Sequence, residues 1–97
     1  MYLDELAEAI RRAVPSEALP DGDIRSLFRA YAVLLLAKGQ EVSPADVHNA
    51  WVAWMAGQDD DHESLIPFSD LDPETQAEDS PYVVAIRTVA RALASEG

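Results

Sequence analysis

Side chains that could bind a ligand or a partner gather in one predicted helix and in the segment that follows it. His48, Trp51 and Trp54 recur three residues apart, and we expect them to share one face of that helix. Two tryptophans at this spacing are typical of core packing, with His48 hydrogen-bonded at the edge, because tryptophan is costly to expose. The alternative interpretation is an aromatic platform for a ligand or a partner.

The run Asp59-Asp60-Asp61-His62-Glu63 could bind a metal ion, but its spacing argues against one. A calcium loop needs glycine at its sixth position and glutamate at its twelfth, where this chain has Ser64 and Asp70. We therefore expect a solvated acidic loop, with no metal and no other cofactor. Because no further histidine, cysteine or lysine is placed to activate a nucleophile, we assign no catalytic residue and expect no enzyme.

The charge of the chain is strongly negative and unevenly distributed. Seven basic and 18 acidic residues give a net charge of −11, which disfavours direct binding of nucleic acid. Residues 57–80 hold nine acidic residues and no Lys or Arg, so the other 73 residues carry a net charge of −2. This segment is either a solvated loop or a surface for a basic partner. The proposed acidic surface comprises Asp59, Asp60, Asp61, Glu63, Asp70 and Asp72.

Helical periodicity runs through nearly all of the sequence, which predicts a single all-α domain over residues 1–97. We expect a small bundle of four main helices, with an extended acidic connector between the third and the last. Residues 1–42 would form an N-terminal helical pair, and residues 43–97 a second helical half. The helix over 24–37 is apolar almost all round in its second half, through Val33 and Leu36, so we expect it to be the most buried.

Capping residues followed by proline set the later helix boundaries. Ser43 before Pro44 predicts the start of the third helix, which should stop at Gly57. Asp72 and Ser80, each before a proline, predict a short helix and then the last long one. The last helix is expected to bury Tyr82, Ile86, Val89 and Leu93 and to expose Arg87 and Arg91.

The apolar run 65–68 is the expected anchor of the acidic connector. Leu65 and Phe68 should be buried against the face formed by Trp51 and Trp54, with His62 at the edge of that contact and residues 59–61 exposed. A buried Phe68 would make Phe68→Ala destabilising by about 3–5 kcal/mol.

Nothing in the sequence suggests a membrane protein. Asp4 and Glu5 stand where a signal peptide would carry Lys or Arg. The longest apolar run, residues 31–37, is far shorter than the ~20 residues of a spanning helix. We expect a cytoplasmic location, or the host cytoplasm if a phage encodes the chain, and a homodimer is an open alternative to a monomer.

Two blocks of the sequence resemble the RyR domain, the repeat of ryanodine receptors that also occurs alone in bacterial and phage proteins. The blocks are His48-Asn49-Ala50-Trp51 and residues 61–71, followed by Asp79 before a helix; the resemblance covers about residues 43–93. A Gly-Trp-x-Tyr-Gly segment usual between the blocks is missing, and Glu63 replaces a proline. As a whole the chain is similar to small proteins of actinobacteria and their phages that form a family of unknown function.

The resemblance implies a non-enzymatic binding module that holds a protein partner or a small ligand, of nucleotide type in prokaryotic proteins. The candidate binding residues are His48, Trp51, His62, Phe68 and Arg87. The alternative function is an acidic inhibitor or decoy, of phage type, whose residues 57–80 occupy a basic groove by mimicking phosphate charge. A decoy complex should weaken steeply as ionic strength rises, whereas binding in a pocket should not.

Overall fold

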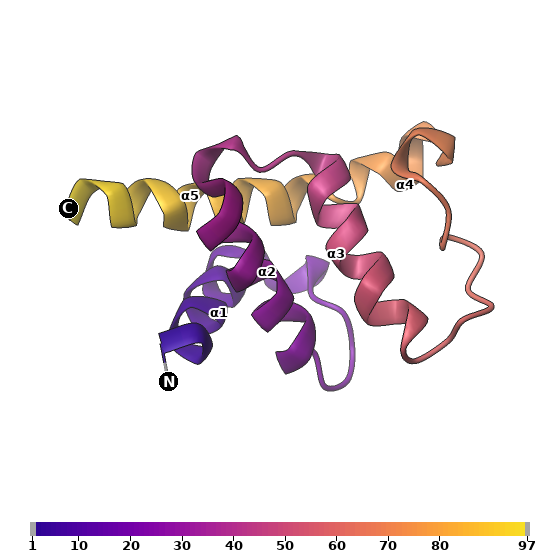
Figure 1. Ribbon diagram of the computed structural model, residues 1–97, viewed down its shortest axis with the longest axis horizontal. Coiled ribbons are helices and arrows are strands. Elements are labelled where there is room, and N and C mark those ends of the chain that lie inside the picture. The colour runs from indigo at the N-terminus through magenta and orange to yellow at the C-terminus, as the bar shows by residue number, and fades with distance from the viewer. Residues whose placement is uncertain (1, 97) are drawn as a thin grey trace.

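The computed structural model describes residues 2–96, and this part of the chain contains helices and no strand (Figure 1). The long helices are α1 (Tyr2–Ala13), α2 (Arg25–Lys38), α3 (Pro44–Ala56) and α5 (Ser80–Glu96). Shorter elements join them: α4 (Pro73–Ala77) and the 3-10 turns η1 (Ser16–Ala18), η2 (Gly39–Glu41) and η3 (Phe68–Asp70). The prediction of an all-α bundle of four main helices is confirmed.

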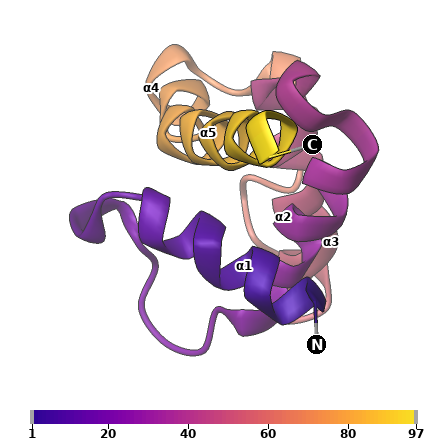
Figure 2. The same cartoon turned by 90° about the vertical axis from the view of Figure 1, so that its left-hand side faces the viewer.

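Helix α2 lies at the centre of the bundle. It contacts α1, α3 and α5, while α5 runs along the long dimension of the molecule and also packs on α1 and η2 (Figures 1 and 2). The connector between α3 and α5 loops out at the opposite end from both termini (Figure 1). The molecule measures 41 × 25 × 25 Å. We call the part where α1, α2 and α5 pack together the packed end, and the part that carries the connector the connector end (Figure 1).

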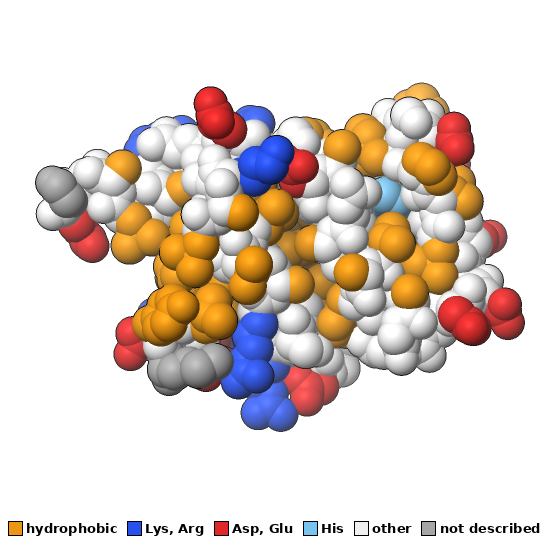
Figure 3. Space-filling model, viewed as in Figure 1, with side chains coloured by type: hydrophobic (Ala, Val, Ile, Leu, Met, Phe, Trp, Pro, Cys, Tyr) orange, Lys and Arg blue, Asp and Glu red, His pale blue; other side chains and the backbone are white. Residues whose placement is uncertain are grey.

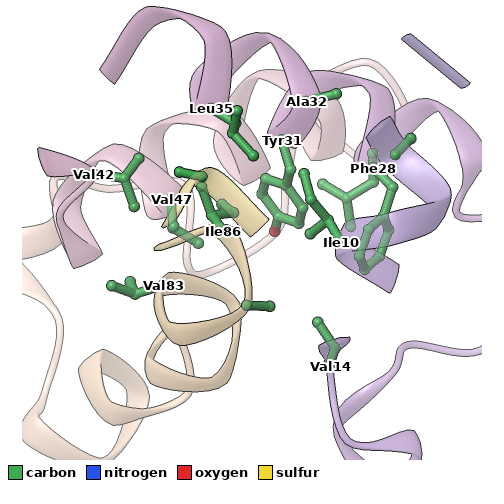
Figure 4. Close-up of a cluster of buried hydrophobic side chains, with 14 residues drawn as sticks. Ile10, Val14, Phe28, Tyr31, Ala32, Leu35, Val42, Val47, Val83 and Ile86 are labelled. Carbon is green, nitrogen blue, oxygen red and sulfur yellow. The ribbon is translucent and has the colours of Figure 1, made fainter. Parts of the chain in front are cut away.

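The core is formed around the inner face of α2 (Figure 4). Phe28 and Tyr31 are almost completely buried, and their rings meet edge-on with centroids 5.3 Å apart. The expectation that α2 is the most buried helix agrees with its five buried side chains. Its second half is nevertheless covered on one side: Val33 and Leu36 are each 54% exposed, because they lie off the buried stripe.

The capping signals place the later helices correctly. At the start of α3 the Ser43 hydroxyl accepts a hydrogen bond from the Asp46 amide (3.2 Å), and the Asp46 carboxylate accepts one from the Ser43 amide (2.9 Å). Asp72 caps α4 by accepting from the Thr75 amide at 2.8 Å. The two caps fix where α3 and α4 begin.

The last helix departs from its predicted burial pattern at four residues. Tyr82 and Val89 are half-buried and not buried. Ile86 is fully buried as expected, but Leu93 is 42% exposed, because the C-terminal end of α5 extends beyond the other helices (Figure 1). Arg91 is exposed as expected. Arg87 is half-buried, and its Nε donates a hydrogen bond to the Val42 carbonyl at 2.9 Å, so its expected exposure is wrong.

The connector is held at a residue that the sequence reasoning did not select. Leu71 is 8% exposed, whereas Leu65 and Phe68 are half-buried. The ring of Phe68 lies 6.1 Å from the ring of His48, and within residues 2–96 it makes no ring contact with either tryptophan. The predicted burial of Leu65 and Phe68 against the tryptophan face is therefore wrong, while the predicted exposure of residues 59–61 is confirmed.

Across residues 2–96, no helix combines the length and the apolar character that crossing a bilayer requires.

Candidate functional site

A pocket of about 410 Å³ lies between the start of α5, the inner face of α3, the connector and the segment after α1. Three of the five predicted binding residues line it: His48, Trp51 and His62. His48 and Trp51 come from α3, and His62 comes from the connector fourteen residues after His48. The fold thus brings together side chains that the sequence placed in separate segments.

Hydrogen bonds and ring contacts fix the orientation of both histidines. His48 is 3% exposed, and its Nε2 donates to the Ile66 carbonyl at 2.7 Å, because a carbonyl oxygen can accept but not donate. The His62 Nδ1 accepts from the Ser64 amide at 3.0 Å. The ring of Trp51 stacks on His48 at 5.7 Å and meets the ring of His62 edge-on at 5.0 Å. These three rings form one ordered aromatic wall.

Trp54 does not belong to this wall, and the expectation that it shares a face with His48 and Trp51 is wrong. A residue six positions along an α-helix is rotated by about 240°, so Trp54 lies on another side of α3 from His48. Its indole Nε1 donates to the Ser26 hydroxyl of α2 at 2.8 Å. Trp54 therefore ties two helices together, while Trp51 faces the pocket.

Phe68 and Arg87 also lie outside the described pocket wall. Phe68 packs behind His48, and its carbonyl accepts a hydrogen bond from Gln76 Nε2 at 3.0 Å. Arg87 binds the carbonyl of Val42, as described above. Phe68 thus supports a pocket residue from outside, and Arg87 takes part in the helix packing.

Asp79 is the most unusual group of the pocket wall, and the prediction of site residues omitted it. Its Oδ2 atom is buried and has no hydrogen-bond partner within residues 2–96. Burial raises the pKa of the Asp79 carboxyl to about 6; the charge of His48 acts against this rise, and that of Glu78 adds to it. The sequence singled out Asp79 as the residue before the last helix, but no local pattern signals its burial.

Two tyrosines complete the polar side of the pocket. Burial raises the pKa of Tyr31 far above its usual value, and the neighbouring Tyr82 and Asp79 contribute to that rise. The Tyr82 hydroxyl donates to the carbonyl of Ala18 at 2.5 Å. Tyr31 makes no such bond within residues 2–96, and its hydroxyl is a free donor and acceptor in the wall. Helical periodicity predicted the burial of Tyr82, which is only half-buried, and did not show the pocket.

The acidic connector faces solvent. The six predicted surface residues are all exposed: Asp59, Asp60, Asp61, Glu63, Asp70 and Asp72. Within residues 2–96, no acidic residue of the segment 57–80 forms an ion pair. In Figure 3, the connector end of the visible face shows acidic side chains and no Lys or Arg, whereas the rest of the face shows both signs of charge. The segment's negative charge is therefore not neutralised by the described part of the chain.

Most of the basic side chains are already paired with acids elsewhere. Ion pairs join Arg11 and Arg12 to Glu8, Arg25 to Asp23, Arg29 to Asp4 and Lys38 to Asp46. In the described part of the chain, no three histidine, aspartate or glutamate side chains are grouped so that they could hold a metal ion.

A family model for a domain of unknown function, DUF7701, matches residues 1–91. No curated protein and no solved structure matches the chain. The matched range includes the pocket wall, the connector and the buried face of α2. Since it covers nearly the whole sequence, the chain belongs to the DUF7701 family.

Proposed function

We propose that this domain is a non-enzymatic, RyR-like binding module that acts in the cytoplasm and holds a small molecule in the pocket at His48, Trp51 and His62. The observation that carries the proposal is the convergence of these three residues on one concave wall. Pockets of about 300–1,000 Å³ with aromatic walls and a few fixed polar groups are the usual form of small-molecule sites.

The pocket is ordered before any ligand arrives, which favours binding. Both imidazole rings are held by backbone groups, His48 by Ile66 and His62 by Ser64. A ligand that stacks on Trp51 therefore meets side chains that lose little further freedom.

Binding suits this wall better than catalysis does. A nucleophile is normally activated by a base within hydrogen-bond reach. Among the described residues, the hydroxyls of Ser64 and Thr75 make no hydrogen bond to a histidine nitrogen. The contact between Ser64 and His62 uses the backbone amide instead.

The two tryptophans of the chain allow a test with an internal control, because Trp51 lines the pocket and Trp54 does not. Trp54→Phe leaves Trp51 as the sole indole, and Trp51→Phe leaves Trp54. Both variants are titrated with nucleotides, ADP-ribose and small amines while tryptophan fluorescence is recorded. We expect a saturable change with at least one compound in Trp54→Phe and none in Trp51→Phe.

A saturable response of Trp54 without one of Trp51 would place binding elsewhere and contradict the proposal. The absence of any response across the panel would also contradict it. Loss of binding in a Trp51→Phe variant that is as stable as the wild type would support the assignment, because unfolding could not then explain the loss.

The exposed acids of the connector, which form no ion pair within residues 2–96, favour a second candidate function, an acidic decoy that occupies a basic groove of another protein. Such a surface presents several negative charges without internal counter-ions, as a phosphate backbone does. The aromatic wall has no part in this second function, which uses the acidic residues of the connector. The first function uses His62 of the same connector together with His48 and Trp51.

The decoy function is tested with poly-lysine as a basic probe and with two charge-matched variants. Asp59→Asn/Asp60→Asn/Asp61→Asn removes three charges from the connector, and Glu5→Gln/Glu17→Gln/Glu41→Gln removes three exposed charges elsewhere. A decoy surface predicts a much weaker, less salt-dependent complex for the first variant than for the second. Equal weakening would show that net charge alone acts, and would exclude a dedicated connector surface.

A further inference from the structure

The charges around the pocket restrict the chemistry of what it can hold. The described wall contains the carboxylates of Glu78 and Asp79 and no Lys or Arg. Helix α2 also contributes to the wall, through Leu27 and Tyr31. Its arginines are already paired, Arg25 with Asp23 and Arg29 with Asp4. An anionic ligand would therefore meet the negative charge of two carboxylates and find no Lys or Arg in the described wall.

The helix end at the pocket does not compensate for this. The N-terminus of a helix can hold a phosphate through its free amides. At α5 the residue before the helix is Asp79 itself, and Pro81 in the first turn has no amide hydrogen to donate. The next two amides of the helix, those of Tyr82 and Val83, already donate to the Asp79 carbonyl.

A cation, by contrast, finds complementary groups on both sides of the pocket. Asp79 has a buried oxygen with no partner within residues 2–96, and the free hydroxyl of Tyr31 can accept a hydrogen bond. Aromatic faces attract cations, tryptophan most strongly, and Trp51 supplies such a face in the same wall. The net charge of −11 raises the local concentration of cations further.

We infer that the pocket binds a small protonated amine carried on an apolar or aromatic body, with Asp79 as the counter-ion and Trp51 against the body. This inference rests on the proposed function, since it names the class of ligand for the same pocket. The ammonium group donates to the Asp79 carboxylate and to the Tyr31 hydroxyl, and the apolar body covers the aromatic wall.

Three compounds with one shared body and different charges test the inference: phenethylamine, phenethyl alcohol and phenylacetate. Binding is followed by NMR through the indole N–H signals, which the variants Trp51→Phe and Trp54→Phe assign. We expect phenethylamine to shift the Trp51 signal at up to about 10 mM and to bind at least about tenfold more tightly than the other two.

Asp79→Asn is the decisive variant, because asparagine keeps the size of the side chain and removes the charge. We expect it to bind phenethylamine no better than phenethyl alcohol. Glu74→Gln is the matched control, because it also removes one negative charge, and Glu74 is exposed and lies outside the described wall. This control should bind phenethylamine like the wild type.

Undiminished amine binding by Asp79→Asn overturns the inference, as does failure of phenethylamine to shift the Trp51 signal. Equal or tighter binding of phenethyl alcohol or phenylacetate at Trp51 also overturns it, while leaving the proposed pocket function intact. The proposed function fails separately, when no compound of the wider panel changes the fluorescence of Trp51.

Discussion

The packed end of the molecule, around Phe28, and its pocket end, around Trp51 and the connector, differ in how completely their side chains are buried, although the same few helices form both. Around Phe28, the facing side chains of α1, α2 and α5 are apolar and exclude solvent almost completely. Around Trp51, several aromatic side chains are only partly buried, and a carboxylate oxygen of Asp79 is buried without a hydrogen-bond partner within residues 2–96. Natural proteins commonly hold such unfavourable groups at binding sites, where a rigid scaffold supplies the stability. The packed end is that scaffold here.

The largest effect should follow from a cavity at the packed end. Phe28→Ala removes a ring that is 1% exposed and contacts the rings of Tyr31 and Tyr82. We expect it to lower the free energy of unfolding by about 3–5 kcal/mol, a large part of the stability of a small domain. Urea denaturation measures this, with the exposed Val33→Ala of the same helix as a control that changes stability by less than about 0.5 kcal/mol. Similar losses in the two variants would contradict the assigned core.

At the pocket end, the smaller side chain, Leu71, should contribute more to the free energy of unfolding than the larger one, Phe68. Leu71→Ala is expected to lower the free energy of unfolding by about 2–3 kcal/mol, since Leu71 is 8% exposed. Phe68→Ala should cost about 1–2 kcal/mol, because a half-buried ring loses less apolar contact. Urea midpoints of the two variants give the comparison. A larger loss for Phe68→Ala would restore Phe68 as the anchor of the connector.

The cap of α3 bears on the pocket end, because this helix carries His48 and Trp51 of the pocket wall. Ser43→Ala removes the hydroxyl that accepts from the Asp46 amide, and it should lower stability by about 1 kcal/mol. Ser16→Ala is the control, since the Ser16 side chain makes no hydrogen bond within residues 2–96. Thermal unfolding of both variants measures the difference. Equal melting temperatures would mean that the capping box adds nothing to the helix.

Local chemistry explains why the helix boundaries could be predicted. Ser43, Asp72 and Ser80 each precede a proline, and this signal depends on neighbouring residues alone. Burial was harder, because Val33, Leu36 and Leu93 are apolar residues that the other helices do not cover. Which side of a helix is covered depends on the packing of distant segments, which periodicity does not encode.

The pocket shows the same division between local and distant information. His48, Trp51 and His62 could be selected because their residue types and spacing suggest a site. Asp79 and Tyr31 could not, since an aspartate before a helix and a tyrosine in an apolar stripe have ordinary structural explanations. Their role depends on the packing of α2, α3, the connector and the start of α5 around one pocket, which local sequence patterns do not encode.

The central claim is that the pocket end keeps the Asp79 carboxylate partly buried at the expense of stability. It is tested most directly by Asp79→Asn. The folded-state pKa of Asp79 is about 6, above its value of 3.8 in the unfolded chain. The native protein therefore loses stability as pH rises through this range, and the full loss is present above pH 6. His48, Glu78, Tyr31 and Tyr82 surround the carboxyl, of which His48 favours its charged form.

Urea unfolding of Asp79→Asn and of the wild type is compared at about pH 7.5 and about pH 5, with Glu78→Gln as a neighbour that removes the same charge. Because Asp79 is partly exposed and screened by solvent, we predict that the variant is more stable than the wild type by about 1 kcal/mol at the higher pH. The advantage should shrink at the lower pH and should exceed that of Glu78→Gln. A variant that is no more stable than the wild type at the higher pH, or whose advantage does not change with pH, would contradict the account.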